Sequence, residues 1–118
     1  MSKNMTKTIM ERIKTHFDSK ETKIIEVPEW GNDSEPLYIY SAPMTLAQKN
    51  RLYKMAKDDD LGLMIEALIM KAKDAQGNCL FSRADKPELM RNCDPEVLIR
   101  VASRIMETTD VDIAEKNL

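Results

Sequence analysis

Few residues of this chain are able to do covalent chemistry. It contains one histidine, His16, and two cysteines, Cys79 and Cys93, among 118 residues. A single imidazole removes nearly every site built on histidine, such as a Ser-His-Asp triad or a His-rich metal cluster. The two cysteines do not form a CxxC pair, and neither has a histidine near it in sequence. We therefore interpret them as two free thiols without a catalytic role, with a disulfide between them as the alternative.

The acidic run Asp58-Asp59-Asp60 is the other feature that could carry chemistry. Paired carboxylates serve acid–base catalysis when they converge in one cleft, whereas consecutive aspartates point in different directions. The run also lacks the alternating ligands, central glycine and terminal glutamate of a calcium loop. The three glycines are scattered singly, so there is no phosphate-binding loop. The sequence predicts a solvated helix cap here, and no catalytic residue, metal ligand or cofactor, in a protein that is not an enzyme.

Charge and hydropathy narrow the classes of partner. Eighteen Lys and Arg stand against twenty Asp and Glu, which gives a formal net charge of −2. That balance argues against nucleic-acid binding, which depends on a basic surface. No apolar run reaches the roughly 18 residues of a membrane span, and charges fill the N-terminal stretch where a signal peptide is apolar. We expect a single domain, residues 1–118, that works inside the cell and away from membranes.

The residues best suited to bind a protein partner are aromatic residues and methionines. Nine methionines outnumber the one tryptophan, three tyrosines and two phenylalanines combined. Because thioethers adapt to different neighbours, helical methionines either fill the core or line a re-packable surface. Trp30 either closes the core or is an exposed anchor, while Tyr38 and Tyr40 either cover the helices or form a patch with it. The partner-binding candidates are Trp30, Tyr38, Tyr40, Met55, Met64 and Met70.

Regular elements must position these side chains, and the sequence marks their boundaries. β-branched runs at 23–27 and 37–40 flank a polar, turn-rich connection, which indicates a β-hairpin. A capping box from Thr45 to Gln48 opens one helix, and Asp94-Pro95 opens another. The expected helices span residues 6–17, 46–57, 61–74, 85–92 and 95–107.

The fold class that follows is mainly α, a small helical domain with an N-terminal β-hairpin packed on about four helices. The 61–74 helix is the most apolar element and is expected at the centre of the core. Gly77 lies in the turn 74–78, where positive φ is common. The ordered core is expected to span about residues 6–107, and the polar, acidic residues 108–118 are expected to form a flexible tail.

Several short segments, in a fixed order, resemble one protein family. Residues 26–31 read EVPEWG, and residues 43–49, after the strand Tyr38-Ile39-Tyr40, read PMTLAQK. Residues 74–81 read DAQGNCLF, a DxxGxxLF pattern. Over about residues 22–107, these segments resemble the tail assembly chaperones of long-tailed bacteriophages. Gln48 stands where that family is expected to have an acidic residue, and it still completes the capping box.

The resemblance implies a small, largely helical, non-enzymatic protein that binds the tape-measure protein and keeps it soluble. It also implies help in recruiting the major tail tube protein, absence from the finished virion, and a location in the cytoplasm of the infected or lysogenic bacterial host. A small structural tail or connector component, or a phage adaptor acting on a host protein, is the alternative. An uncharacterised thiol enzyme is a third hypothesis.

Two further expectations concern other forms of the protein. Members of the family are commonly made in two lengths, the longer one through a backward ribosomal frameshift. If Glu115-Lys116-Asn117 is encoded by GAA, AAA and AAC, the gene contains the slippery heptamer A-AAA-AAC; chance is the alternative. A small protein with an exposed apolar groove is also expected to form a homo-oligomer when no partner is present.

Overall fold

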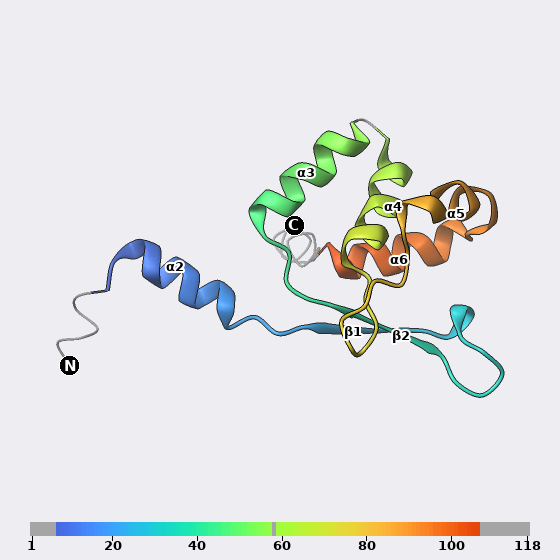
Figure 1. Cartoon of the computed structure of the whole chain (residues 1–118), viewed down its shortest axis with the longest axis horizontal. Coiled ribbons are helices and arrows are strands. Elements are labelled where there is room, and N and C mark those ends of the chain that lie inside the picture. The colour runs from blue at the N-terminus through green and yellow to red at the C-terminus, as the bar shows by residue number, and fades with distance from the viewer. Residues whose placement is uncertain (1–6, 58, 107–118) are drawn as a thin grey trace, which may run out of the picture.

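The computed structural model describes residues 7–57 and 59–106 (Figure 1). The expected tail at 108–118, the codons of Glu115 to Asn117 and Asp58 lie outside the described residues, as do residues 6 and 107. In chain order the elements are α2 (Ile9–Asp18), β1 (Lys23–Val27), η1 (Pro28–Trp30), β2 (Leu37–Ser41), α3 (Leu46–Ala56), α4 (Asp60–Lys71), η2 (Arg83–Asp85), α5 (Lys86–Asn92) and α6 (Pro95–Ile105). The prediction of a mainly helical domain with an N-terminal hairpin is confirmed.

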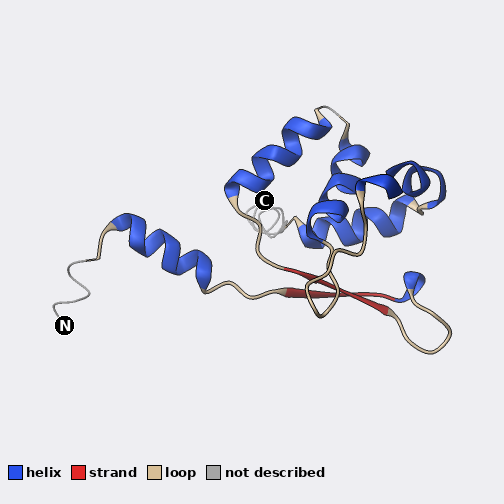
Figure 2. Cartoon of the chain, in the orientation of Figure 1, coloured by secondary structure: helices blue, strands red, loops and turns tan. Residues whose placement is uncertain are grey.

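The hairpin presents one face to the core and the other face away from it. β1 and β2 pair antiparallel, with Ile25 opposite Ile39 and Val27 opposite Leu37. Ile25, Val27 and Ile39 are almost completely buried, whereas the alternate residues Ile24 and Tyr38 are exposed. This period-2 pattern is typical of a sheet covered on one side. Figure 2 shows the later helices, from residue 46 onward, gathered on one side of the hairpin.

The helical layer is built around α4 and α6. Leu68 of α4 and Val101 of α6 are fully buried, and Leu52 of α3 packs into the same cluster. The expected caps are present: Thr45 and Gln48 form a capping box, and the carboxylates of Asp59 and Asp94 accept backbone hydrogen bonds at the starts of α4 and α6. The predicted central position of the 61–74 helix, observed as α4, is confirmed.

The predicted end of that helix, at residue 74, is wrong. α4 ends at Lys71, and Ala72 already has extended backbone angles. The cause is pairing with the hairpin, because Tyr40 and Lys73 exchange two backbone hydrogen bonds of 2.8 and 3.1 Å. Lys73 also pairs with Cys79, so residues 73–79 form a small loop that adds to the sheet. Gly77 takes φ +87° in this loop, as its position in the turn predicted.

The first helix forms but does not join the core, and its predicted start at residue 6 is wrong: the helix begins at Ile9, because Thr8 caps it. Thr8 and Glu11 make a reciprocal capping box at the start of α2. No residue of α2 is buried, and Ile9, Met10 and Ile13 are 65%, 70% and 55% exposed. Figure 1 shows α2 standing apart from the other helices, at the end of the hairpin opposite η1. We call Ile9, Met10, Ile13 and Phe17 the α2 stripe, because these residues share one face of the helix.

Candidate partner-binding site

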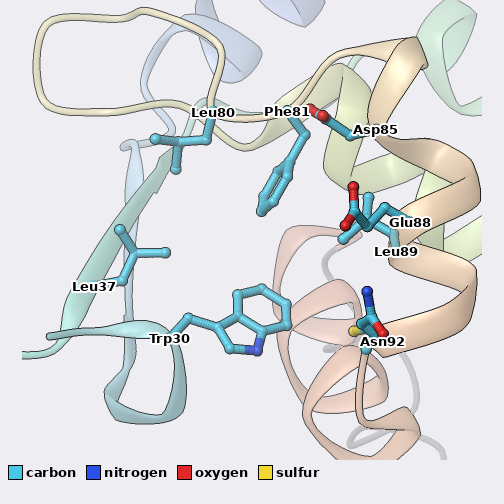
Figure 3. A pocket seen from close by; sticks show the side chains of 9 residues that line it. Trp30, Leu37, Leu80, Phe81, Asp85, Glu88, Leu89 and Asn92 are labelled. Atoms are coloured by element: carbon cyan, nitrogen blue, oxygen red, sulfur yellow. The ribbon is translucent and has the colours of Figure 1, made fainter.

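An apolar groove lies between the hairpin tip and α5 (Figure 3). Its volume is about 450 Å³, which is enough for a few large apolar side chains. Trp30 and Leu37 of the hairpin face Leu89 of α5 across it (Figure 3). We call it the Trp30 groove; its lining residues are Trp30, Leu37, Leu80, Phe81, Asp85, Glu88, Leu89, Asn92 and Cys93.

The hairpin wall of the groove is held by contacts to two other parts of the chain. Pro28 begins a short 3₁₀ turn that carries Glu29 and Trp30 out of β1. The Trp30 ring meets Phe81 edge-on, with centroids 6.1 Å apart and an angle of 76°. The Arg100 guanidinium donates to both carboxylate oxygens of Glu29, at 2.6 and 2.9 Å. These bonds to Arg100 lower the pKa of Glu29 to about 2, with backbone hydrogen bonding as the next cause. The orientation of Trp30 is therefore coupled to α6.

The opposite wall is held by a buried carboxylate that our sequence analysis missed. Glu66, within the apolar helix α4, is only 3% exposed. The Arg83 guanidinium donates to its two oxygens at 2.6 and 3.1 Å, and the Lys86 ammonium donates at 2.7 Å. The Arg83 bonds outweigh burial and lower the pKa of Glu66 to about 2, with Lys86 adding to the effect. The signal was one acidic residue on an otherwise apolar face of α4, which indicates a buried ion pair.

The groove combines an apolar floor with an acidic rim. Leu37, Leu80 and Leu89 supply aliphatic surface, while Asp85 and Glu88 supply carboxylates. Asp85 is partly used, because its carboxylate accepts the backbone N–H of Ser82 at 2.9 Å. Glu88 is exposed in the first turn of α5. Such a surface is complementary to an amphipathic segment whose apolar face is bordered by basic residues.

The structure separates the three aromatic candidates. Trp30 is half-buried and packs against the core cluster, next to Leu37. Tyr38 and Tyr40 alternate with Leu37 and Ile39 along β2 and therefore lie on the face turned away from the helices. The tyrosines thus neither cover the helices nor form a patch with Trp30.

The methionine candidates lie near the contact between α3 and α4. Met55 and Met70 line a second hollow of about 460 Å³, together with Arg51, Ile69, Glu66 and Arg83. Met55 is 42% exposed, whereas Met64 and Met70 are half-buried and pack against the core. Met55 and Met70 are therefore brought together in a hollow that shares no lining residue with the Trp30 groove.

The thiols and Asp59 have the environments of structural residues. Both cysteines are free, as predicted. Burial raises the pKa of the Cys93 thiol, and the nearby Asp94 charge raises it further. The Asp59 carboxylate accepts the Gly62 N–H at 2.9 Å and caps α4, which confirms the predicted cap for this residue. Within 7–57 and 59–106, no group of His, Cys, Asp and Glu side chains is arranged to hold a metal ion.

Comparisons of this chain with known proteins found no match. The chain matches no protein-family model, no curated protein and no solved structure. Among the described helices, none combines the length and the apolar character that crossing a bilayer requires.

Proposed function

We propose that this protein is a tail assembly chaperone of a long-tailed bacteriophage or prophage. It binds the tape-measure protein in the cytoplasm of the bacterial host, keeps that protein soluble, and helps recruit major tail tube subunits. It has no catalytic step and leaves before the virion is complete. The Trp30 groove is the observation that carries the proposal, since it is a pre-formed apolar site suited to a helical client.

The groove fits a helix better than it fits a small molecule. It lies open between the hairpin tip and α5, and its walls carry aromatic and leucine side chains. A client helix would place apolar residues at i, i+3 or i+4, and i+7 along such a groove. A tape-measure protein consists largely of long amphipathic helices, which aggregate when their apolar faces are unoccupied. A chaperone that binds and covers one such face raises the soluble fraction of its client protein.

The segment that carries the family resemblance also builds the groove. Trp30, in the EVPEWG segment, lines the hairpin wall, and Leu80 and Phe81, at the end of the DxxGxxLF segment, line the floor. Two separated parts of the resemblance thus meet at one site. This is the arrangement expected if the shared residues serve a shared binding function.

Co-expression with the tape-measure protein tests the proposal. We expect the soluble fraction of the tape-measure protein to rise severalfold with this chain and to fall again with Trp30→Ala. Tyr38→Ala is the matched control, because it removes an aromatic ring from the opposite face of the hairpin. Circular dichroism of both variants establishes that each remains folded. If the tape-measure protein is equally soluble without this chain, the chaperone function is refuted.

The alternative, a structural tail or connector component, makes a different prediction. A structural component is retained in purified virions at a fixed copy number, whereas a chaperone is absent from them. Quantitative mass spectrometry of purified particles separates the two functions.

A further inference from the structure

Helix α2 has an apolar stripe without a place in its own domain. The exposure of Ile9, Met10 and Ile13 leaves a large apolar surface in contact with water. Such a surface on a short helix normally marks a contact with another molecule. The other half of a suitable contact is present in the same chain, because the Trp30 groove is apolar and open.

We infer that the α2 stripe of one copy of this protein docks in the Trp30 groove of a second copy. This inference concerns self-association and stands without the proposed function, because both surfaces belong to this chain. Two features support it: the charge pattern around the stripe and the position of α2 relative to the groove. The size of the two surfaces sets the expected strength of the association.

The charges bordering the stripe complement the rim of the groove. At about 100° per residue, Lys14 follows the stripe on one side, and Arg12 and His16 follow it on the other. The acidic residues Glu11 and Asp18 lie furthest from it, although Asp18 accepts an exposed hydrogen bond of 2.8 Å from Lys14. The stripe is thus bordered by basic residues, and the rim of the groove carries carboxylates, so the two surfaces have complementary charges. Complementary charges of this kind orient a docking helix and speed its association.

The position of α2 favours a second copy over its own groove. Residues 19–22 join α2 to Lys23, and Lys23 pairs with Ser41 at one end of the hairpin. The groove lies at the other end, beside the pair of Val27 and Leu37 (Figure 1). At about 3.3 Å per strand residue the two ends are more than about 13 Å apart, so the helix would have to reverse along its own hairpin. A neighbouring copy meets no such constraint.

The size of the contact indicates a weak, reversible association. A helix of ten residues against one groove buries less than a standard interface, even when two copies exchange their helices reciprocally. The dissociation constant is therefore expected in the micromolar range. Sedimentation velocity of the full chain, from about 5 to about 200 µM, should show a mass that rises with concentration from one copy toward two. A single-copy mass throughout that range overturns the inference.

Substitutions on the helix identify the docking face. Ile13→Glu places a charge in the stripe and should weaken association at least about tenfold. Because Ile13 is 55% exposed, the change leaves the domain core intact. Thr15→Glu adds the same charge on the polar face of α2 and should leave association unchanged. Equal behaviour of the two variants overturns the inference.

Substitutions on the rim identify the groove. Glu88→Lys with Asn92→Lys puts two ammonium groups beside the groove without touching a buried residue. This double variant should repel the basic borders of α2 and weaken association at least about tenfold. Glu26→Lys with Gln76→Lys makes the same change in net charge at exposed positions away from the groove, and it should associate like the parent chain.

A mixture of the two defective proteins gives the decisive test. The Ile13→Glu protein keeps an intact groove, and the Glu88→Lys, Asn92→Lys protein keeps an intact α2. Their equimolar mixture should form mixed pairs through one remaining contact, at a concentration where neither variant associates alone. Absence of mixed pairs overturns the inference, as would be the case if α2 docked in its own groove. No tape-measure protein enters these assays, so their failure is separate from failure of the proposed chaperone function.

Discussion

The buried carboxylate of Glu66 is expected to be among the largest single polar contributions to stability. The change to make is Glu66→Gln, which keeps the shape of the side chain and removes its charge. In the parent chain three N–H donors from Arg83 and Lys86 lie 2.6 to 3.1 Å from the two carboxylate oxygens. The amide accepts only through one oxygen, so the variant loses charge-assisted bonds and places an NH₂ group against a guanidinium.

The magnitude follows from the pKa and from exposure. The pKa of Glu66 falls from its ordinary 4.5 to about 2. At about 1.4 kcal/mol for each unit, this shift corresponds to an upper limit of about 3 kcal/mol. Arg83 is 58% exposed, so solvent screening reduces the effect, and we expect Glu66→Gln to lower the free energy of unfolding by about 2 kcal/mol. The thermal midpoint should fall by about 8 °C.

The pH dependence has a defined sign. A carboxyl whose pKa is lower in the folded state stabilises the fold above its unfolded pKa and loses that contribution as pH falls. The difference between the parent chain and Glu66→Gln should be constant above about pH 5 and more than half lost by about pH 3. Urea unfolding followed by circular dichroism, at several pH values, measures this difference directly.

Glu29→Gln is the matched control. Glu29 also makes a bidentate ion pair with an arginine and also has a pKa of about 2, but its side chain is 45% exposed. Because water competes for an exposed pair, the loss in this variant should be clearly smaller than in Glu66→Gln. Equal losses in the two variants would refute the argument from burial. A loss below about 0.5 kcal/mol in Glu66→Gln would refute the argument from the pKa.

Three other positions carry predictions of their own. Lys71→Met should raise the free energy of unfolding in urea, because burial lowers the pKa of Lys71 and its ammonium has only two long hydrogen bonds of 3.2 Å, to the oxygens of Pro43 and Gln48; the gain should shrink as pH rises toward 10.5. Gly77→Ala should cost about 1 kcal/mol in the same assay, since φ is +87° while no neighbour obstructs a Cβ, and Gly77→Asn should cost less. Iodoacetamide should label exposed Cys79 before Cys93, whose pKa is raised by burial, and peptide mass spectrometry reads the order.

Local signals in the sequence predicted most of the elements, and contacts between distant residues account for the errors. The capping box of Thr45 and the Asp94-Pro95 start depend on neighbours within four residues, so both helix starts are correct. The end of α4 depends on Tyr40, which is far from Lys73 in sequence. Periodicity cannot anticipate that pairing, because residues 72–74 are compatible with a helix until the sheet competes for their backbone groups.

In the candidate site, too, features set by local sequence were predicted and features set by distant contacts were not. Trp30 and its loop stood out by composition, and the structure places this ring in the groove. The alternation along the strand puts Tyr38 and Tyr40 on one face, but which face meets the helices depends on the core as a whole. Glu66 was missed because its partners lie after the loop at 73–79, Arg83 in η2 and Lys86 at the start of α5. For α2, the helical spacing of apolar residues predicted an apolar face but could not predict what covers that face.

The two walls of the Trp30 groove are attached to the core in the same way. Glu29 and Arg100 tie the hairpin wall to α6, and Glu66 ties the α5 wall to α4 through Arg83 and Lys86. No residue of η1 or α5 is buried, whereas α4 and α6 supply much of the apolar core. The width of the groove therefore depends on these ion pairs together with the apolar contacts of its lining residues with the core. Loss of either ion pair is expected to change the groove as well as the stability of the fold.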